Sequence, residues 1–153
     1  MKIIGFTIKK VSAERKSDIK GKLEIKSGLN IDDITKEEIK ISEKHSMKFD
    51  FSYTVDYSPD IAKIEINGSI IALDDSNESK EILKDWKKKK FNHAIKLPLF
   101  NFIMDKCNLK ALQLEEEIGL PFHIPMPKLA PNPNPNPQNR DSKNSKNPAN
   151  YTG

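Results

Sequence analysis

The chain has a single cysteine, only six glycines among 153 residues, and no long apolar run. One cysteine, Cys107, excludes an internal disulfide framework and fits a reducing compartment. The scattered glycines form no phosphate-binding loop. The apolar start, residues 3–8, ends at two lysines and is too short for a secretory signal, and no stretch approaches the roughly 20 apolar residues of a membrane span. We therefore expect a cytoplasmic protein without membrane insertion.

Neither sign of charge dominates the composition. The net charge is +4, and half of this excess lies beyond residue 130. So weak a field does not by itself indicate nucleic-acid binding. With 36% hydrophobic residues, the chain predicts one domain with a modest core, at residues 1–130. Residues 131–153 begin with Asn-Pro repeats and continue with Asn, Ser and Lys, which predicts a disordered tail.

Residues 47–73 carry the clearest pattern. Every odd position from Met47 to Tyr57 is apolar and every even position between them is polar, as in a strand with one buried face. Ser58-Pro59-Asp60 predicts a turn, after which the alternation resumes through Ile70. The pattern predicts a β-hairpin whose apolar face must be covered by other parts of the chain.

Two further strands are predicted before the hairpin. Residues 4–11 and 22–29 alternate in the same way, and the polar residues 12–20 predict a loop between them. Residues 31–43 are ambiguous: Thr35 to Glu38 resemble the start of a short helix, whereas Ile39 and Ile41 could lead into the hairpin.

After Leu73 the apolar period becomes helical. Asp74, Asp75 and Ser76 are candidate N-caps for a helix that buries Ile82, Leu83 and Trp86. A second helix is predicted over residues 97–118, with Pro98 in its first turn, Glu115, Glu116 and Glu117 facing solvent, and Gly119 ending it. The fold class is therefore α+β: a four-stranded antiparallel sheet followed by two helices packed on one side.

No constellation of residues predicts catalysis, a metal site or a cofactor. His45, His93 and His123 share no metal-type spacing, and Cys107 on an apolar helix is typical of a small buried hydrophobe. We therefore expect no enzyme. An enzyme of the sheet-and-helix thioesterase type ranks only third among the functions considered, because the long helix offers no placed catalytic base beyond Asp105. The run Lys87, Lys88, Lys89 and Lys90 leaves a second alternative open, a small oligomeric nucleic-acid-binding module, although a solvated helix end explains the run as well.

Apolar surface is in surplus. The second helix is apolar nearly all round over residues 97–107, and residues 120–129 are apolar yet held extended by three prolines. This surplus predicts a homo-oligomer, dimer or tetramer, and an apolar groove between the second helix and the segment after Gly119. The residues expected to line the groove are Phe100, Met104, Phe122, Ile124 and Met126; alternatively, these side chains complete the core.

Two stretches resemble the SecB-like protein-export chaperones. Residues 99–107, with the sequence LFNFIMDKC, are similar to the start of that family's long helix, and residues 119–125, GLPFHIP, are similar to the stretch that follows it. The slightly basic charge and the Asn-Pro tail depart from the bacterial pattern, so the resemblance implies an archaeal or atypical member. It further implies a homotetrameric holdase that works without ATP and binds unfolded or pre-export polypeptides in apolar grooves. Such a protein serves protein transport and protein folding.

Overall fold

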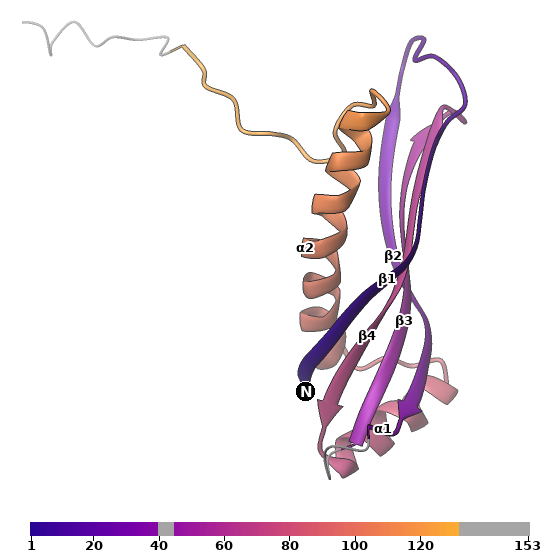
Figure 1. Ribbon diagram of the computed structural model, residues 1–153, viewed down its shortest axis with the longest axis vertical. Coiled ribbons are helices and arrows are strands. Elements are labelled where there is room, and N and C mark those ends of the chain that lie inside the picture. Colours follow the sequence, from indigo (N-terminus) through magenta and orange to yellow (C-terminus); the bar gives the residue numbers. More distant parts are fainter. Residues whose placement is uncertain (40–44, 132–153) are drawn as a thin grey trace, which may run out of the picture.

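The computed structural model describes residues 1–39 and 45–131 (Figure 1). Four strands precede two helices, which confirms the predicted fold class. The elements are β1 (Lys2–Arg15), β2 (Glu24–Glu37), β3 (His45–Ser58), β4 (Ala62–Asp74), α1 (Ser76–Lys87) and α2 (His93–Glu117). The tail that the sequence predicts to be disordered is residues 131–153. Beyond residue 131 it lies outside the described residues.

The predicted hairpin forms the centre of an antiparallel sheet with the strand order β1-β4-β3-β2. Its register pairs Met47 with Ala72 at one end and Tyr57 with Ala62 at the other. The odd-numbered side chains of β3, from Met47 to Tyr57, are all buried. The alternation of the sequence therefore places one face of the sheet in the core, as predicted.

The two outer strands are longer than predicted because each contains a register shift. β1 shifts against β4 between Ile8 and Lys10, so that Phe6 and Ile8 face the core before the shift and Ala13 faces it afterwards. A bulge adds one residue and moves the following side chains to the other face. Residues 12–15 therefore continue the strand, and the predicted loop from residue 12 is wrong there.

A similar shift between Ile31 and Asp33 resolves the ambiguous stretch before the hairpin. Ile31 and Ile34 both pack toward the core although their spacing is odd. Thr35 pairs with Lys48 and Glu37 with Ser46, so this stretch is strand up to Glu37, and of the two alternatives left open the helical one is wrong. Ile41 lies outside the described residues.

The first helix, α1, follows β4 as predicted, with Asp75 at its N-cap. It contacts β2 and β3, and Ile82 is buried in the core. The Trp86 indole contributes twice: its ring meets the ring of Phe91 edge-on at 6.2 Å, and its Nε1 donates to Asp33 Oδ1 on β2. These contacts hold α1 near one end of the sheet.

The second helix, α2, begins four residues earlier than predicted. Asn92 is its N-cap, and the Asn92 side chain accepts a hydrogen bond from the Ala94 amide at 2.9 Å. Pro98 therefore lies inside the helix, and not in its first turn, where its missing N–H removes one backbone hydrogen bond. Buried residues recur at every fourth position: Leu99, Ile103, Cys107, Ala111 and Glu115.

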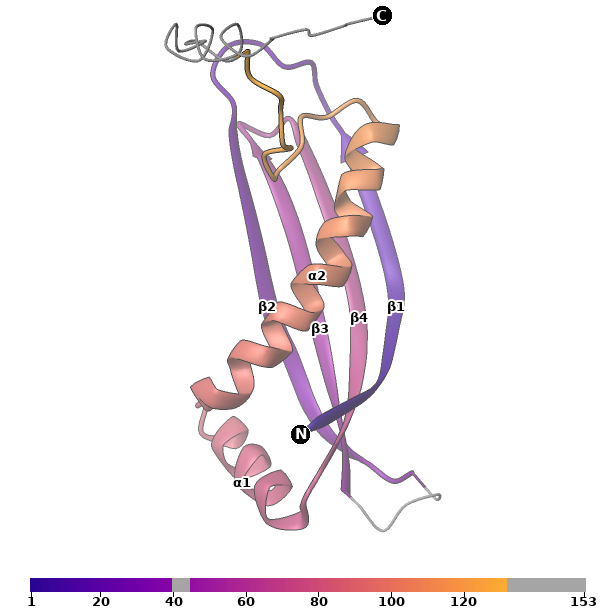
Figure 2. The ribbon, with the colours of Figure 1, turned by 90° about the vertical axis from the view of Figure 1, so that its left-hand side faces the viewer.

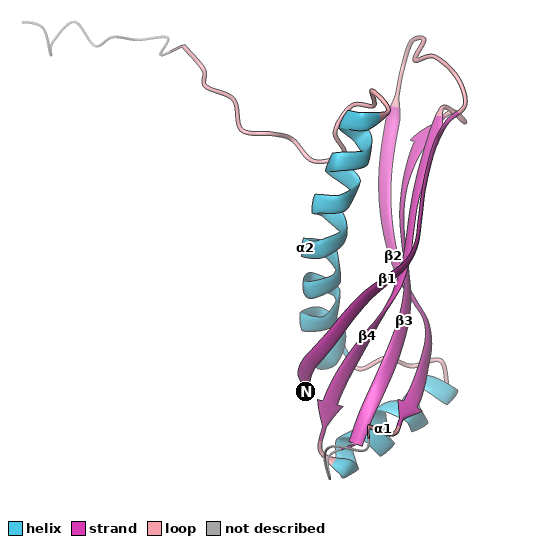
Figure 3. Cartoon of the chain, in the orientation of Figure 1, coloured by secondary structure: helices cyan, strands magenta, loops and turns pink. Residues whose placement is uncertain are grey.

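That buried stripe lies across the apolar face of the sheet. Figure 2 shows α2 crossing the strands diagonally, from the β2 side at its start to the β1 side at its end. Figure 3 shows α2 alongside the sheet and α1 at one end of it, where Ile82 joins the same core. None of the helices in the described part of the chain is long and apolar enough to cross a membrane.

Candidate functional site

The diagonal course of α2 leaves two corners of the sheet face that α2 itself does not cover. One corner lies beside the end of α2, where residues 120–131, which we call the strap, return over β3 and β4 (Figure 2). The other lies beside the start of α2 and is hollowed into a cavity. Both corners are candidate sites because each exposes parts of the chain next to the core.

The strap begins at a tight helix end. Gly119 has a φ of 68°, in the left-handed region that glycine adopts without steric cost. The Leu120 amide donates to the Glu115 carbonyl at 2.8 Å, and the Leu120 side chain is buried. From β1, the Arg15 guanidinium donates to the Ile118 and Gly119 carbonyls at 3.3 and 3.0 Å. This cation neutralises the negative end of the helix where the chain reverses.

Two tyrosines of β3 then hold the strap. The Tyr57 hydroxyl donates to the Pro121 carbonyl at 2.6 Å. The Tyr53 hydroxyl donates to Asn108 Oδ1 on α2 at 2.7 Å and lies 3.0 Å from His123 Nε2 on the strap. Burial raises the pKa of both phenols above the ordinary value, and the nearby Glu115 carboxylate adds to the effect. Both tyrosine hydroxyls therefore keep their protons and their hydrogen bonds, within a row of buried β3 side chains that is otherwise apolar.

The shortest of the strap's polar contacts joins Glu115 of α2 to His123 of the strap. Glu115 Oε1 lies 2.5 Å from His123 Nδ1, and Glu115 Oε2 accepts the backbone amide of His123 at 3.2 Å. The Glu115 side chain is fully buried and that of His123 almost so. The prediction that Glu115 faces solvent is wrong, because it continues the buried stripe of α2; Glu116 and Glu117 are exposed as predicted.

The five predicted groove residues are divided between two places. Phe122, Ile124 and Met126 lie together on the strap and, with Pro125 and Lys128, line a hollow of about 480 Å³. Phe100 instead lines a second hollow of about 340 Å³ near the start of α2, with Phe91 and Leu97. Met104 is half-buried on α2 and lines neither hollow.

The strap is anchored at one end and exposed beyond it. His123 and Ile124 are largely covered, whereas the Phe122 and Met126 side chains are 42% and 50% exposed and Leu129 is fully exposed. The last described part of the strap runs away from the sheet (Figure 1). The strap thus presents apolar side chains to solvent next to a buried polar anchor.

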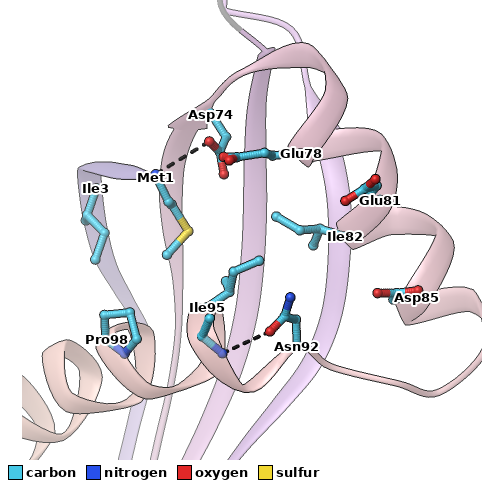
Figure 4. A pocket seen from close by; sticks show the side chains of 11 residues that line it. Met1, Ile3, Asp74, Glu78, Glu81, Ile82, Asp85, Asn92, Ile95 and Pro98 are labelled. Atoms are coloured by element: carbon cyan, nitrogen blue, oxygen red, sulfur yellow. Dashed lines mark hydrogen bonds and ion pairs between the residues drawn. The ribbon is translucent and has the colours of Figure 1, made fainter.

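The opposite corner holds a cavity of about 480 Å³ among β1, α1 and the first turns of α2. Figure 4 shows Ile3, Ile82, Ile95 and Pro98 on its apolar side. Carboxylates surround the rest: Asp74, Glu78, Glu81 and Asp85. The pKa of Glu78 is raised, mainly by its hydrogen bond to Asp74 and next by repulsion from the charge of Asp74.

The other candidates from the sequence lie apart. Cys107 is buried on α2, and burial raises its pKa to about 11, so it is an unreactive thiol. Lys87, Lys88, Lys89 and Lys90 are exposed at the end of α1, and Asp105 is exposed on α2. Within residues 1–39 and 45–131, no three His, Cys, Asp or Glu side chains gather as a metal site would require.

The Glu115–His123 pair was missed because the histidines were tested only for metal-ligand spacing. One signal was available in the sequence. Leu99, Ile103, Cys107 and Ala111 are spaced by four on one helix face, and Glu115 is the next position of that series. A carboxylate on a buried stripe needs a hydrogen-bonding partner, which His123 supplies.

No family model matches the chain, and no curated protein matches it. Among solved structures, the fold is similar to a SecB-like chaperone of Mycobacterium tuberculosis, in complex with a ChAD peptide from the HigA1 antitoxin. The two chains share 9% sequence identity, with a TM-score of 0.49, over 85% of this chain and 91% of the other.

Proposed function

We propose that the protein is an ATP-independent holdase chaperone that binds unfolded or pre-export polypeptides on the apolar surface of the strap. The observation that carries this proposal is the exposure of Phe122 and Met126 on a segment that is itself anchored to the core. Because the segment is anchored, its apolar side chains already form a surface before a client binds. Binding then does not incur the full entropy cost of ordering this segment.

The chemistry of this surface suits clients of many sequences. Methionine is flexible and polarizable, so Met126 adapts to different apolar side chains. Burial of one Phe stabilises a complex by roughly 1.5–3 kcal/mol, so a few such contacts reach micromolar affinity, about 8 kcal/mol, after ordering costs. The outer edges of β1 and β2 add unpaired backbone groups to which an extended client could bond.

The decisive experiment is suppression of aggregation of a denatured model protein without nucleotide. Wild type should suppress aggregation equally at low and high salt, because apolar capture is not screened. The alternative, nucleic-acid binding through Lys87 to Lys90, would weaken steeply with salt.

A double variant tests the position of the surface. Phe122→Ser with Met126→Ser should fold like wild type and lose client capture. The matched control is Ile4→Ser with Val11→Ser, which removes two exposed apolar side chains from β1 and should leave capture unchanged. A folded strap variant with wild-type suppression would contradict the proposed surface, and an unfolded one would show that these residues complete the core.

A further inference from the structure

Positive charge is concentrated where α1 ends and α2 begins. Residues 87–96, which we call the basic junction, contain no carboxylate and five lysines: Lys87, Lys88, Lys89, Lys90 and Lys96. The whole chain has a net charge of +4, so without these five positive charges the other residues have a net charge of −1. All five lysine side chains are exposed. The protein is therefore basic at this one junction and slightly acidic in the rest of its sequence.

The lysines of the basic junction have no internal counter-ion. Among the residues that the structure describes, no ion pair involves any of the five. Lysines of the sheet differ, since Lys9 pairs with Asp50 at 2.6 Å and Lys16 pairs with Asp60 at 2.8 Å. The field of the basic junction is therefore not neutralised within the described chain and attracts anions.

The acidic cavity described above lies on a different face of α2. Ala94 and Pro98 line that cavity together with its carboxylates, whereas Lys96 and Phe100 line the hollow beside the basic junction. At 3.6 residues per turn, these two pairs of residues lie on opposite faces of the helix. The first turns of α2 therefore separate the carboxylates from the exposed cations.

The turn between the helices keeps a lysine in a strained conformation. Lys89 has a φ of 57°, in the left-handed region that glycine or asparagine usually occupies after a helix. The Lys89 and Lys90 amides donate to the Trp86 and Asp85 carbonyls at 2.9 and 2.8 Å, which ends α1 in a Schellman motif. A lysine at a position where glycine would fit without strain points to a use of its charge outside folding.

Exposed apolar side chains adjoin these cations. Leu97 is 55% exposed, and the Lys96 Nζ lies 5.0 Å from the centroid of the half-buried Phe100 ring. Phe91, which directly follows Lys90, forms another wall of the same hollow. Lysines beside exposed leucine and phenylalanine are typical of surfaces that lie in the interface of a bilayer.

We propose that the basic junction is a docking surface for an anionic phospholipid bilayer, with Leu97 and Phe100 entering the interface between headgroups and acyl chains. The argument is charge complementarity, because cytoplasmic leaflets are negatively charged. Each lysine near such a surface strengthens binding by about fivefold. The cations do not have to converge on one ligand, since a charge acts over about 10 Å at about 0.1 M salt. Such docking is peripheral and needs no spanning helix.

Nucleic acid is the other polyanion that five lysines could bind, and two features favour the bilayer. Residues 87–104 contain no arginine, the residue that binds phosphates and guanine through two parallel hydrogen bonds. The exposed leucine also has no stacking partner in a nucleic acid, whereas a bilayer interface buries it.

The docking surface is separate from the strap. It lies at the start of α2, whereas the strap follows the end of that helix. Docking therefore does not rest on the proposed function. If both proposals hold, a client on the strap would be brought to a membrane by the opposite end of the same helix.

Co-sedimentation of the full chain with lipid vesicles tests the docking surface. Vesicles of phosphatidylcholine with about one-third phosphatidylglycerol should bind the protein at least about tenfold more tightly than vesicles of phosphatidylcholine alone. This difference should shrink when the salt concentration is raised from about 0.1 M to about 0.5 M. Equal binding to the two kinds of vesicle at low salt would overturn the proposal.

Two triple variants test which lysines are responsible. Lys88→Gln with Lys89→Gln and Lys90→Gln should weaken binding to the anionic vesicles by roughly 100-fold. The matched control is Lys20→Gln with Lys22→Gln and Lys63→Gln, which removes the same charge from exposed lysines at the end of the sheet opposite α1. It should change binding by less than about threefold, because these charges lie more than a Debye length away. Equal losses in the two variants would contradict a surface at the basic junction.

Leu97→Gln distinguishes a bilayer from a nucleic acid, since it keeps every charge and a residue that favours helix. It should weaken binding to anionic vesicles by about tenfold, because an apolar side chain no longer enters the interface. A single-stranded oligonucleotide is the comparison ligand. Oligonucleotide binding tighter than vesicle binding, with no effect of Leu97→Gln on either, would make the junction a nucleic-acid site and refute the proposal.

The strap variant of the proposed function completes the comparison. Phe122→Ser with Met126→Ser should bind anionic vesicles like wild type, and loss of binding in this variant would place the bilayer contact on the strap. Failure to suppress aggregation counts against the proposed function alone, and failure to bind anionic vesicles counts against the docking surface alone.

Discussion

The Phe51 ring lies directly against the α-carbon of Gly68 on the neighbouring strand. A β-carbon added at Gly68 would come within 2.7 Å of Phe51 Cζ and would also collide with the Thr7 carbonyl oxygen of β1. Phe51 stacks on Phe6 at 5.6 Å between ring centroids, and Phe6 meets Phe102 of α2 edge-on at 5.9 Å. This glycine therefore makes room for the aromatic contact between the sheet and the long helix.

Gly68→Ala should destabilise the protein by about 1–3 kcal/mol, because the added methyl group overpacks a tight site between two strands. Urea unfolding followed by circular dichroism measures the change. Gly28→Ala is the matched control: the nearest atom to its β-carbon is Thr54 Oγ1 at 3.4 Å, so it should cost little. Equal effects of the two substitutions would contradict the packing argument.

Tyr57→Phe should lower the free energy of unfolding by about 0.5–1.5 kcal/mol, because it removes the hydroxyl that bonds to the Pro121 carbonyl and keeps the buried ring. Limited proteolysis after residue 120 should accelerate more than cleavage within the sheet. An unchanged cleavage rate would show that this bond does not hold the strap.

Stability should fall at alkaline pH. The buried Cys107, Tyr53 and Tyr57 side chains all have raised pKa values, so the folded chain keeps protons that the unfolded chain loses above about pH 8.5 for cysteine and about pH 10 for tyrosine. Each such group lowers the free energy of unfolding by at most about 1.4 kcal/mol per pH unit above that pH. Urea titrations at about pH 7 and about pH 10 measure the loss.

Thiol labelling provides the control for that prediction. Native Cys107 should resist alkylation at neutral pH and react at once in denaturant, because it is buried and protonated. Rapid labelling of the native chain would show that the α2 interface opens readily and would remove the basis for the alkaline effect of the thiol.

The predicted homo-oligomer is best tested on the outer side of α2. Leu99 is fully buried and Phe102 packs on Phe6, so substituting either would damage the core of one subunit. Leu109, which is 64% exposed, is the better probe. Leu109→Asp should dissociate an oligomer at micromolar concentration, and Gln113→Asp, one turn further on and also exposed, should not. Light scattering that shows a monomeric wild type would refute the prediction.

The hairpin and both helices could be predicted from the sequence because their apolar periods are unbroken. The outer strands could not be predicted in full, because a register shift inserts a residue and reverses the period. The spacing of Ile31 and Ile34 does not by itself decide between strand and helix. The pairing of this stretch with β3 makes it a strand.

The apolar character of the strap is evident from its composition, and the structure places Phe122, Ile124 and Met126 around one hollow. That this hollow binds a client stays a prediction. Phe100 was expected beside these residues. It lies near the start of α2, whereas the strap follows the end of that helix, and no local pattern in the sequence contains this separation. The anchor depends on contacts among β3, α2 and the strap, which no local pattern contains.

The pairing of β1 with β4 also determines when the sheet can form during synthesis. Lys2 pairs with Leu73, so β1 has no partner strand until most of β4 has left the ribosome. α2 and the strap, which cover the apolar face, emerge later still. Pairings between residues so distant in sequence slow folding, and exposed apolar strands aggregate meanwhile. A nascent copy of this protein would itself present the kind of surface that the finished copies are proposed to bind.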